Sequence, residues 1–363
     1  MNRTALSALA SCLKVLLGAF LIFSAFTKFV DIEQLYVYIY SFRIFSLSLS
    51  VVAGWFVVAV ELLIGVAFVT NRHHRLTSVA NILLLVAFTL FLSFALWTGR
   101  SDSCHCLGEL MPFNPTQSLL KNGVLILLSL FVWRYAGSGF KPRWWLSAVA
   151  VLLPYVVIVV ASLSGLLGMN YYEFQYLSVL AACMLAVALL LSFGFWQRWY
   201  VQAAAVLTPF VSILVLSAWV NLFQSKESLP YNAPMLQRAV SEQGQLSDAG
   251  LREGRKVVAF YSASCQYCKE ASRKLSIIQQ RNALPESQFV TVFPGNDTVG
   301  FSSFYQDDYV KRYAEYPLTP DTFLHLTYGS FPLVLLMDDG EVVATFSQSS
   351  LSERAVCDFI QER

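Results

Sequence analysis

The sequence predicts a polytopic α-helical membrane domain followed by a small α/β domain. Two features of the composition lead to this fold class. The 363 residues are 56% hydrophobic and only 13% charged, whereas soluble globular proteins carry about 25% charged residues. The charges are also unevenly divided, because residues 1–225 hold 12 Lys/Arg and 6 Asp/Glu, while residues 226–363 hold 13 and 17. A charge-poor membrane part therefore precedes an acidic soluble part that is long enough to form its own core.

The membrane part contains seven apolar stretches, each of about the 20 residues that a helix needs to cross a bilayer. They are residues 8–30, 47–70, 76–98, 116–135, 144–168, 174–196 and 199–223. We expect the first four to form one domain over residues 1–136 and the other three a second over 137–224. The polar, tyrosine-rich stretch 31–46 is too polar to span, and we expect it to form a helix at the membrane interface.

The placement of lysine and arginine predicts how these helices are oriented. With the N-terminus in the cytoplasm, the inner segments hold seven basic residues: Arg3, Arg72, Arg75, Arg134, Lys141, Arg143 and Arg198. The outer segments then hold four: Lys28, Arg43, Arg100 and Lys121. Seven helices would put the C-terminal domain outside, so we expect a multi-pass protein of the bacterial inner membrane with a periplasmic domain. No basic run indicates a nucleic-acid partner.

The soluble part is expected to begin with a linker over residues 225–252, with a short helix at 233–242, and to fold over 253–363. The run KVVAFYSA indicates a buried strand, and a helix follows from Cys265. SQFVTVFPG predicts a second strand, DDYVKRYAEY a helix, FPLVLLMDDGEVVATFSQ a hairpin and LSERAVCDFIQER a last helix. This order is typical of a mixed sheet with helices on both faces.

The segment FYSASCQYCKE carries the clearest chemical motif, the Cys-x-x-Cys pair formed by Cys265 and Cys268. A pair that directly follows a strand and opens a helix is the redox arrangement of thioredoxin-like domains. At a helix N-terminus, the free N–H groups and the helix dipole favour a thiolate. We therefore expect Cys265 to act as nucleophile and Cys268 to resolve the mixed disulfide. A zinc site would need a second ligand pair, and among histidines and cysteines this domain adds only His325 and Cys357.

The segment GSFPLV supports the same fold class. In the thioredoxin fold a cis-proline opens the third main strand and faces the redox pair, so Pro332 is expected to be cis and to shape the substrate groove. The alternative is an ordinary trans proline at the start of a strand. The separation between Cys268 and Pro332 exceeds that of a minimal thioredoxin, which predicts an insertion around residues 295–329.

A second cysteine pair, Cys104 and Cys106, lies in SDSCHCLGELMP between the third and fourth apolar stretches. A disulfide between cysteines one residue apart closes a small, strained ring, and strained, exposed disulfides are the labile ones. Redox exchange is the favoured role for this loop cysteine pair. Its alternatives are metal binding together with His105, or disulfides to other loops.

Glu61 lies within the second apolar stretch, where an isolated carboxylate is costly and is a functional candidate. Counted from the ends of the stretches, Lys14 comes to a similar depth, so we expect either a structural ion pair or a proton-handling role for the two. Lys28 is expected to lie at the membrane interface.

Three segments resemble the MauE/DoxX-like family: GAFLIFSAFTKFVD at 18–31, VELLIGVAF at 60–68, and CHCLGELMP followed by NGVLILLSLFVWR. The resemblance covers about residues 10–135, although His105 stands where the family pattern has glycine. The soluble part is similar to thioredoxin-like domains fused to such membrane proteins in some bacteria. The resemblance implies a MauE/DoxX-like bundle for the first four helices and periplasmic thiol chemistry. MauE-type proteins are associated with methylamine utilisation, in which they assist maturation of a disulfide-rich dehydrogenase subunit.

These features predict a membrane-anchored thiol–disulfide oxidoreductase that acts on exported, cysteine-containing proteins. The Cys-x-x-Cys pair would exchange electrons with the loop cysteine pair, and the direction of flow is not fixed by the sequence. No covalently bound cofactor is expected, and a quinone or an external redox partner would be the final donor or acceptor. The alternatives are a non-catalytic maturation factor for a disulfide-rich exported protein and a redox-sensing transporter.

Overall fold

The computed structural model describes residues 3–30, 32–70, 74–98, 113–136, 144–164, 171–192, 207–208, 211, 215, 229–295, 304–305 and 310–361. The chain folds as two compact units. The first comprises residues 1–38 and 51–217, and the second comprises residues 39–50 and 218–363. Each unit has its own hydrophobic core.

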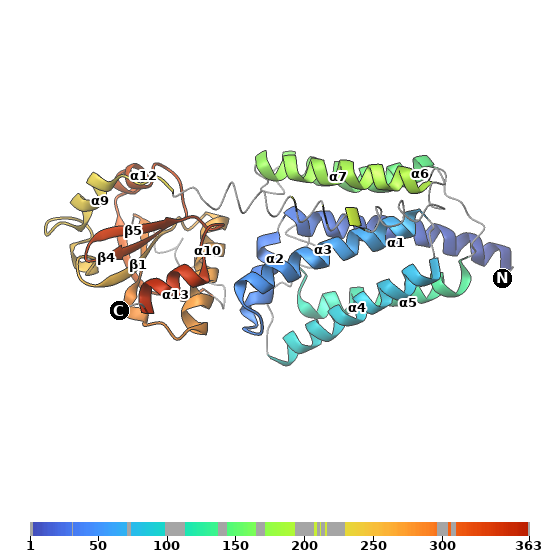
Figure 1. Ribbon diagram of the computed structural model, residues 1–363, viewed down its shortest axis with the longest axis horizontal. Helices are drawn as coiled ribbons and strands as arrows, with labels where there is room; N and C mark the ends of the chain where they lie inside the picture. Colours follow the sequence, from blue (N-terminus) through green and yellow to red (C-terminus); the bar gives the residue numbers. More distant parts are fainter. Residues whose placement is uncertain are drawn as a thin grey trace. The chain divides into compact units, whose positions relative to one another are not determined.

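The first unit is helical, and its long helices lie side by side (Figure 1). Its elements are α1 (Arg3–Val30), most of α2 (Ile32–Ser41), most of α3 (Leu47–Val69), α4 (His74–Trp97), α5 (Pro115–Tyr135), α6 (Trp144–Leu163) and α7 (Tyr171–Ser192). Among the described residues, five helices are long and apolar enough to cross a membrane, namely α1, α3, α4, α5 and α6. They correspond to the first five predicted spans. Helix α7 covers most of the sixth, while the seventh, 199–223, lies almost wholly outside the described residues.

The outward faces of these helices are apolar. On α4, the exposed residues Leu76, Leu83 and Leu90 recur every seven positions, and so share one side of the helix. On α5, Leu120 and Leu127 repeat the spacing. In water such stripes would be unfavourable over this length. They fit contact with lipid, as expected of a multi-pass membrane protein.

Helices α1 and α3 approach one another closely where both carry glycine. A Cβ atom on Gly18 would lie 2.8 Å from the carbonyl oxygen of Gly65, and one on Gly65 would lie 2.8 Å from Cγ1 of Ile22. Glycine at such a crossing lets two helix backbones come together. The crossing fixes which residues of α1 face which residues of α3 further along.

The second unit is built on a five-stranded mixed sheet with the order β3-β2-β1-β4-β5. The strands are β1 (Arg255–Phe260), β2 (Phe289–Pro294), β3 (Ala314–Leu318), β4 (Leu333–Asp338) and β5 (Glu341–Phe346). Strands β1, β2 and β3 run parallel to one another, whereas β4 pairs antiparallel with both β1 and β5. Asp339 and Gly340 take positive φ angles in the β4–β5 turn, which confirms the predicted hairpin.

Helices cover both faces of this sheet, as predicted (Figure 1). Helices α9 (Ala233–Val240) and α12 (Pro320–Thr327) pack over the inward side chains of one face, such as Val258 and Phe260. Side chains alternate along a strand, so Val257 and Ala259 point to the other face. Helices α10 (Gln266–Arg281) and α13 (Glu353–Gln361) contact each other, and α13 contacts β1. The arrangement is a thioredoxin-like α/β fold.

The structure differs from the predicted helix in the second half of the soluble part. The predicted helix at 307–316 does not form over Val310–Tyr313, and Ala314–Leu318 is the edge strand β3. Pairing with β2 outweighs local helix propensity there, and Pro317 is tolerated because β3 is an edge strand. The expected insertion at 295–329 thus contains β3 and α12, which belong to the sheet and its cover.

The predicted linker also differs from the structure. Helix α9 and the short 3-10 turn Ser247–Ala249 follow residue 229, and both belong to the folded unit. Leu236, Val240, Leu246 and Leu251 are all buried in its core. These side chains cover a face of the sheet that would otherwise contact water, which explains why the segment folds onto the domain.

Candidate redox-active site

The Cys-x-x-Cys pair lies where β1 gives way to α10. Cys265 is the N-cap of α10, with φ −89° and ψ 118°, and its Sγ accepts a hydrogen bond from the backbone N–H of Cys268 at 3.3 Å. An N-cap side chain commonly satisfies one of the free N–H groups of the first turn. Here the group that does so is the sulfur that sequence analysis assigned as nucleophile.

The two sulfur atoms have opposite environments. A hydrogen bond from the Cys268 thiol, together with backbone N–H groups of the first turn, lowers the pKa of Cys265 to about 7. Cys268 is fully buried, and this desolvation raises the pKa of its thiol well above the ordinary range. Cys265 is therefore the sulfur of the pair that ionises near neutral pH, whereas Cys268 keeps its proton. Both cysteines are free thiols in the structure.

Ser262 adds a contact that sequence reasoning missed. Its backbone N–H lies 3.4 Å from Sγ of Cys268, and its carbonyl accepts from the N–H of Cys265 at 3.1 Å. The turn between β1 and α10 thus holds both cysteines through its own main chain. No side-chain pattern encodes contacts made by main-chain atoms, so the sequence offered no signal for them.

Pro332 lies at the same end of the sheet. The Phe331–Pro332 peptide bond is cis, which confirms the sequence prediction for this bond. Leu333, the first residue of β4, pairs with Phe260, the last residue of β1. Cys265 follows Phe260 by only five positions. The register therefore brings Pro332 and the Cys-x-x-Cys pair to the same end of the neighbouring strands β4 and β1.

The loop cysteine pair cannot be placed in the same way. Cys104, His105 and Cys106 all lie outside the described residues. Their predicted redox exchange stays a prediction.

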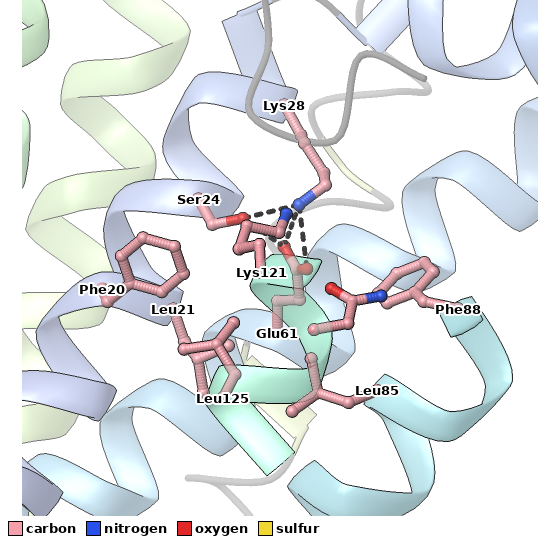
Figure 2. A pocket seen from close by; sticks show the side chains of 10 residues that line it. Phe20, Leu21, Ser24, Lys28, Glu61, Leu85, Phe88, Lys121 and Leu125 are labelled. Carbon is pink, nitrogen blue, oxygen red and sulfur yellow. Dashed lines mark hydrogen bonds and ion pairs between the residues drawn. The ribbon is translucent and has the colours of Figure 1, made fainter. Parts of the chain in front are cut away.

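A second group of polar residues lies inside the helical unit. The Nζ atom of Lys28 lies 2.9 and 2.8 Å from the two carboxylate oxygens of Glu61, and it donates to Oγ of Ser24 at 2.6 Å. Lys28 and Glu61 are only 3% and 4% exposed. Figure 2 shows these contacts as dashed lines from Lys28 to Ser24, both on α1, and to Glu61 on α3.

This geometry corrects two expectations. The partner of Glu61 is Lys28 instead of Lys14, and Lys28 is buried in the bundle instead of lying at the interface. The physical reason is the glycine crossing of α1 and α3, which aligns Gly18 with Gly65 and so places Lys28 opposite Glu61. Lys14, on the far side of that crossing, is also buried.

A small cavity of about 20 Å³ adjoins the Lys28–Glu61 pair. Lys121 and Asn122 of α5 line it on the polar side. Its other walls are the apolar residues Phe20, Leu21, Leu85, Phe88 and Leu125. Four helices, α1, α3, α4 and α5, contribute to this cavity, which we call the bundle pocket.

The chain is similar to known proteins in sequence and in structure. Residues 6–135 match the family described as methylamine utilisation protein MauE, which confirms the resemblance noted over residues 10–135. Protein TlpB of Flavobacterium psychrophilum is 21% identical over 333 residues, covering 87% of this chain and 84% of that protein. The thioredoxin domain of a thiol-disulfide oxidoreductase from Bacteroides vulgatus is 20% identical, with a TM-score of 0.26, over 32% of this chain and 84% of that domain.

Proposed function

We propose that the protein is a membrane-anchored thiol–disulfide oxidoreductase whose catalytic thiols are Cys265 and Cys268. The observation that carries the proposal is the contrast between these two sulfurs at one helix N-terminus. Cys265 has a lowered pKa and a half-buried side chain, while Cys268 is fully buried beside it. A reactive cysteine needs thiolate character and access, and a resolving cysteine needs only proximity.

The reaction has two exchange steps. The Cys265 thiolate attacks one sulfur of a substrate disulfide, so that a mixed disulfide forms and one substrate thiolate leaves. Cys268 then gives up its proton and attacks Sγ of Cys265, which releases the second substrate sulfur. Two electrons and the Cys268 proton pass from the domain to the substrate, whose other thiolate takes a proton from water, and the reverse sequence oxidises a substrate dithiol. Pro332, at the same end of the sheet as the two cysteines, would border the bound substrate segment.

The substrates are proposed to be exported proteins with cysteines, because the basic residues favour an outer location for the C-terminal domain. In the bacterial inner membrane that location is the periplasm, where disulfides persist. The loop cysteine pair would then be the internal partner of the Cys-x-x-Cys pair. Covalent attachment of the two domains makes this exchange intramolecular and raises the effective concentration of one pair near the other.

Trapping of mixed disulfides tests the proposal. In a Cys268→Ser variant the first exchange can occur and the second cannot, so we expect the covalent intermediate on Cys265 to accumulate. Mass spectrometry of non-reduced peptides would identify the partner sulfur. A link to Cys104 or Cys106 would support the internal exchange, and a link to other proteins would identify substrates. A Cys265→Ser/Cys268→Ser variant is the matched control, and turnover of a dithiol substrate by that control would refute the assignment.

A second candidate function is favoured by the family match at residues 6–135, which carries the description methylamine utilisation. In that case the protein would hold the cysteines of one client during its assembly without turning over. The two functions predict different stoichiometry. A catalyst oxidises or reduces many equivalents of substrate, whereas a maturation factor gives a one-to-one complex with its client.

A further inference from the structure

Three buried tyrosine hydroxyls lack a hydrogen-bond partner in the described residues after position 229: those of Tyr261, Tyr305 and Tyr313. A buried polar group that forms no hydrogen bond costs free energy, so each such group in a folded protein needs an explanation. Tyr261 is the one that adjoins the redox-active site. It directly precedes Ser262, whose backbone N–H lies 3.4 Å from Sγ of Cys268.

Tyr261 lies on the same side of the sheet as Cys268. Its backbone N–H donates to the carbonyl oxygen of Val292 at 2.9 Å, which continues the pairing of β1 with β2 by one residue. Phe260 points to the face that α9 and α12 cover, and side chains alternate along a strand, so Tyr261 points to the other face. Helix α10 packs on that face, and Cys268 is fully buried between this helix and the sheet (Figure 1).

The Tyr261 hydroxyl is held in this layer as a hydrogen-bond donor. The side chain is 1% exposed, and its ring centroid lies 5.7 Å from that of Phe304 and 6.2 Å from that of Phe293. Burial raises the pKa of the hydroxyl well above its ordinary range, and a negative charge on Cys268 raises it further. The hydroxyl therefore keeps its proton at neutral pH. Ser272, one turn beyond Cys268 on α10, is a polar neighbour of the hydroxyl but forms no hydrogen bond with it.

The resolving step needs a donor at this position. In the reduced pair the thiol of Cys268 donates to Cys265, and this contact serves the first exchange. Once Cys265 is bound to the substrate sulfur, its thiolate is gone, and Cys268 has to ionise in a site where burial opposes the charge. The backbone N–H of Ser262 is one donor to the Cys268 sulfur. A second donor that is already in place would lower the barrier, because it gains its partner only when the charge develops.

We propose that the Tyr261 hydroxyl donates a hydrogen bond to Sγ of Cys268 while that sulfur ionises and attacks the mixed disulfide. The bond between Cys268 and Cys265 forms as the bond between Cys265 and the substrate sulfur breaks. The substrate sulfur leaves with the electron pair and takes the Cys268 proton, and Tyr261 keeps its own proton. The inference rests on the proposed function and adds a residue to its second step, while the first step needs no contact with Tyr261.

A single-turnover reaction of the reduced full-length protein in detergent with the aromatic disulfide DTNB tests the inference. One nitrothiobenzoate is released when Cys265 attacks, and a second is released when Cys268 resolves. Release by a Cys265→Ser/Cys268→Ser variant is subtracted to remove the contribution of the other cysteines. Tyr261→Phe removes only the hydroxyl. It should leave the first phase unchanged and slow the second by about tenfold or more, as for the loss of a hydrogen bond to a charged group.

Tyr313→Phe is the matched control. It also removes a buried hydroxyl without a partner, but the polar neighbours of that hydroxyl are Ser276 and Glu286 instead of a cysteine. Both phases should be unchanged in this variant. Thermal unfolding guards against misfolding, because Tyr261→Phe removes an unpartnered polar group and should unfold at the same temperature as the unchanged protein or at a higher one. A hydroxyl with only a structural role would not slow the second phase selectively.

The possible outcomes separate this inference from the proposed function. Equal second phases in Tyr261→Phe and the unchanged protein would overturn the role of Tyr261 and leave the proposed function standing. Equal slowing of both phases, or an equal effect of Tyr313→Phe, would also overturn it. If the unchanged protein released no nitrothiobenzoate through Cys265, the proposed function would fail, and the role of Tyr261 would fail with it.

Discussion

The backbone N–H of Cys268 donates a hydrogen bond to Sγ of Cys265 across 3.3 Å, so the proposed resolving cysteine supports the charge on the proposed nucleophile. The contact exists because Cys265 is the N-cap of α10 and Cys268 is the third residue of its first turn. The same spacing buries Cys268 against the core. One helix terminus thus produces both the reactive thiolate and the protected thiol.

The pKa of Cys265 predicts how its alkylation depends on pH. Because this pKa is lowered to about 7 from an ordinary 9.0, about half of the sulfur is thiolate at pH 7, against about 1% for an unperturbed thiol. We expect the rate of iodoacetamide labelling to rise through pH 7 and to level off above pH 8. Peptide mass spectrometry of the reduced protein measures this rate for Cys265 alone.

Cys357 and a Cys268→Ala variant provide the controls for this titration. Burial raises the pKa of Cys357, so its labelling should remain slow at pH 7. Cys268→Ala removes the thiol that donates to Cys265, and the labelling midpoint of Cys265 should move upward in pH. A midpoint near 9 in the unchanged protein would contradict the structural account of the thiolate.

The sequence was informative where chemistry depends on neighbours along the chain. The strand before Cys265, the helix after it and the cis bond at Pro332 follow local patterns, and all three are present. It was misleading where geometry depends on distant residues. Residues 314–316 belong to a predicted helix, and only pairing with β2 makes 314–318 a strand. Glu61 pairs with Lys28 through a helix crossing that counting from the helix ends does not reveal.

The folded state of the segment before β1 predicts a stability effect at Leu236. This side chain is 3% exposed and packs in the core of the soluble unit. Leu236→Ala should lower the free energy of unfolding of that unit by about 2–5 kcal/mol, as for other buried leucines. Gln237→Ala, at an exposed position on the same helix, should change it by less than about 0.5 kcal/mol. Pulse proteolysis in urea measures both, and equal values would mean that this segment is a free tether.

The crossing of α1 and α3 predicts a steric effect at its glycines. A Cβ atom on Gly18 would lie 2.6 Å from Cγ2 of Val69 and 2.8 Å from the carbonyl oxygen of Gly65. The second neighbour is backbone, which cannot rotate away. Gly18→Ala should therefore destabilise the bundle by about 1–3 kcal/mol, the usual range for overpacking.

Gly123→Ala is the matched control for this crossing. A Cβ atom there meets nothing within 4 Å among the described residues, and alanine favours a helix over glycine by up to about 1 kcal/mol. Thermal unfolding in detergent, followed by circular dichroism, compares the two variants. A Gly18→Ala protein as stable as the Gly123→Ala protein would show that α1 and α3 are not in close contact.

The buried Lys28–Glu61 pair predicts that single and double substitutions will differ sharply. Removal of one partner leaves an uncompensated charge in a low-dielectric interior, which costs about 3–5 kcal/mol. We therefore expect large losses of stability in Lys28→Met and in Glu61→Leu. The double variant Lys28→Met/Glu61→Leu buries no unpaired charge from this pair, so its stability should return to within about 1–2 kcal/mol of the unchanged protein.

An exposed ion pair shows what the same chemistry contributes in water. Arg354 and Asp358 are 3.5 Å apart with side chains 91% and 55% exposed, and Arg354→Ala should cost less than about 0.5 kcal/mol.

Denaturation by SDS in mixed micelles measures the stability of the bundle variants, and urea unfolding measures that of the Arg354→Ala variant. If the two single substitutions in the bundle were additive in the double variant, Lys28 and Glu61 would not be coupled. The polar side of the bundle pocket would then need a different structural basis.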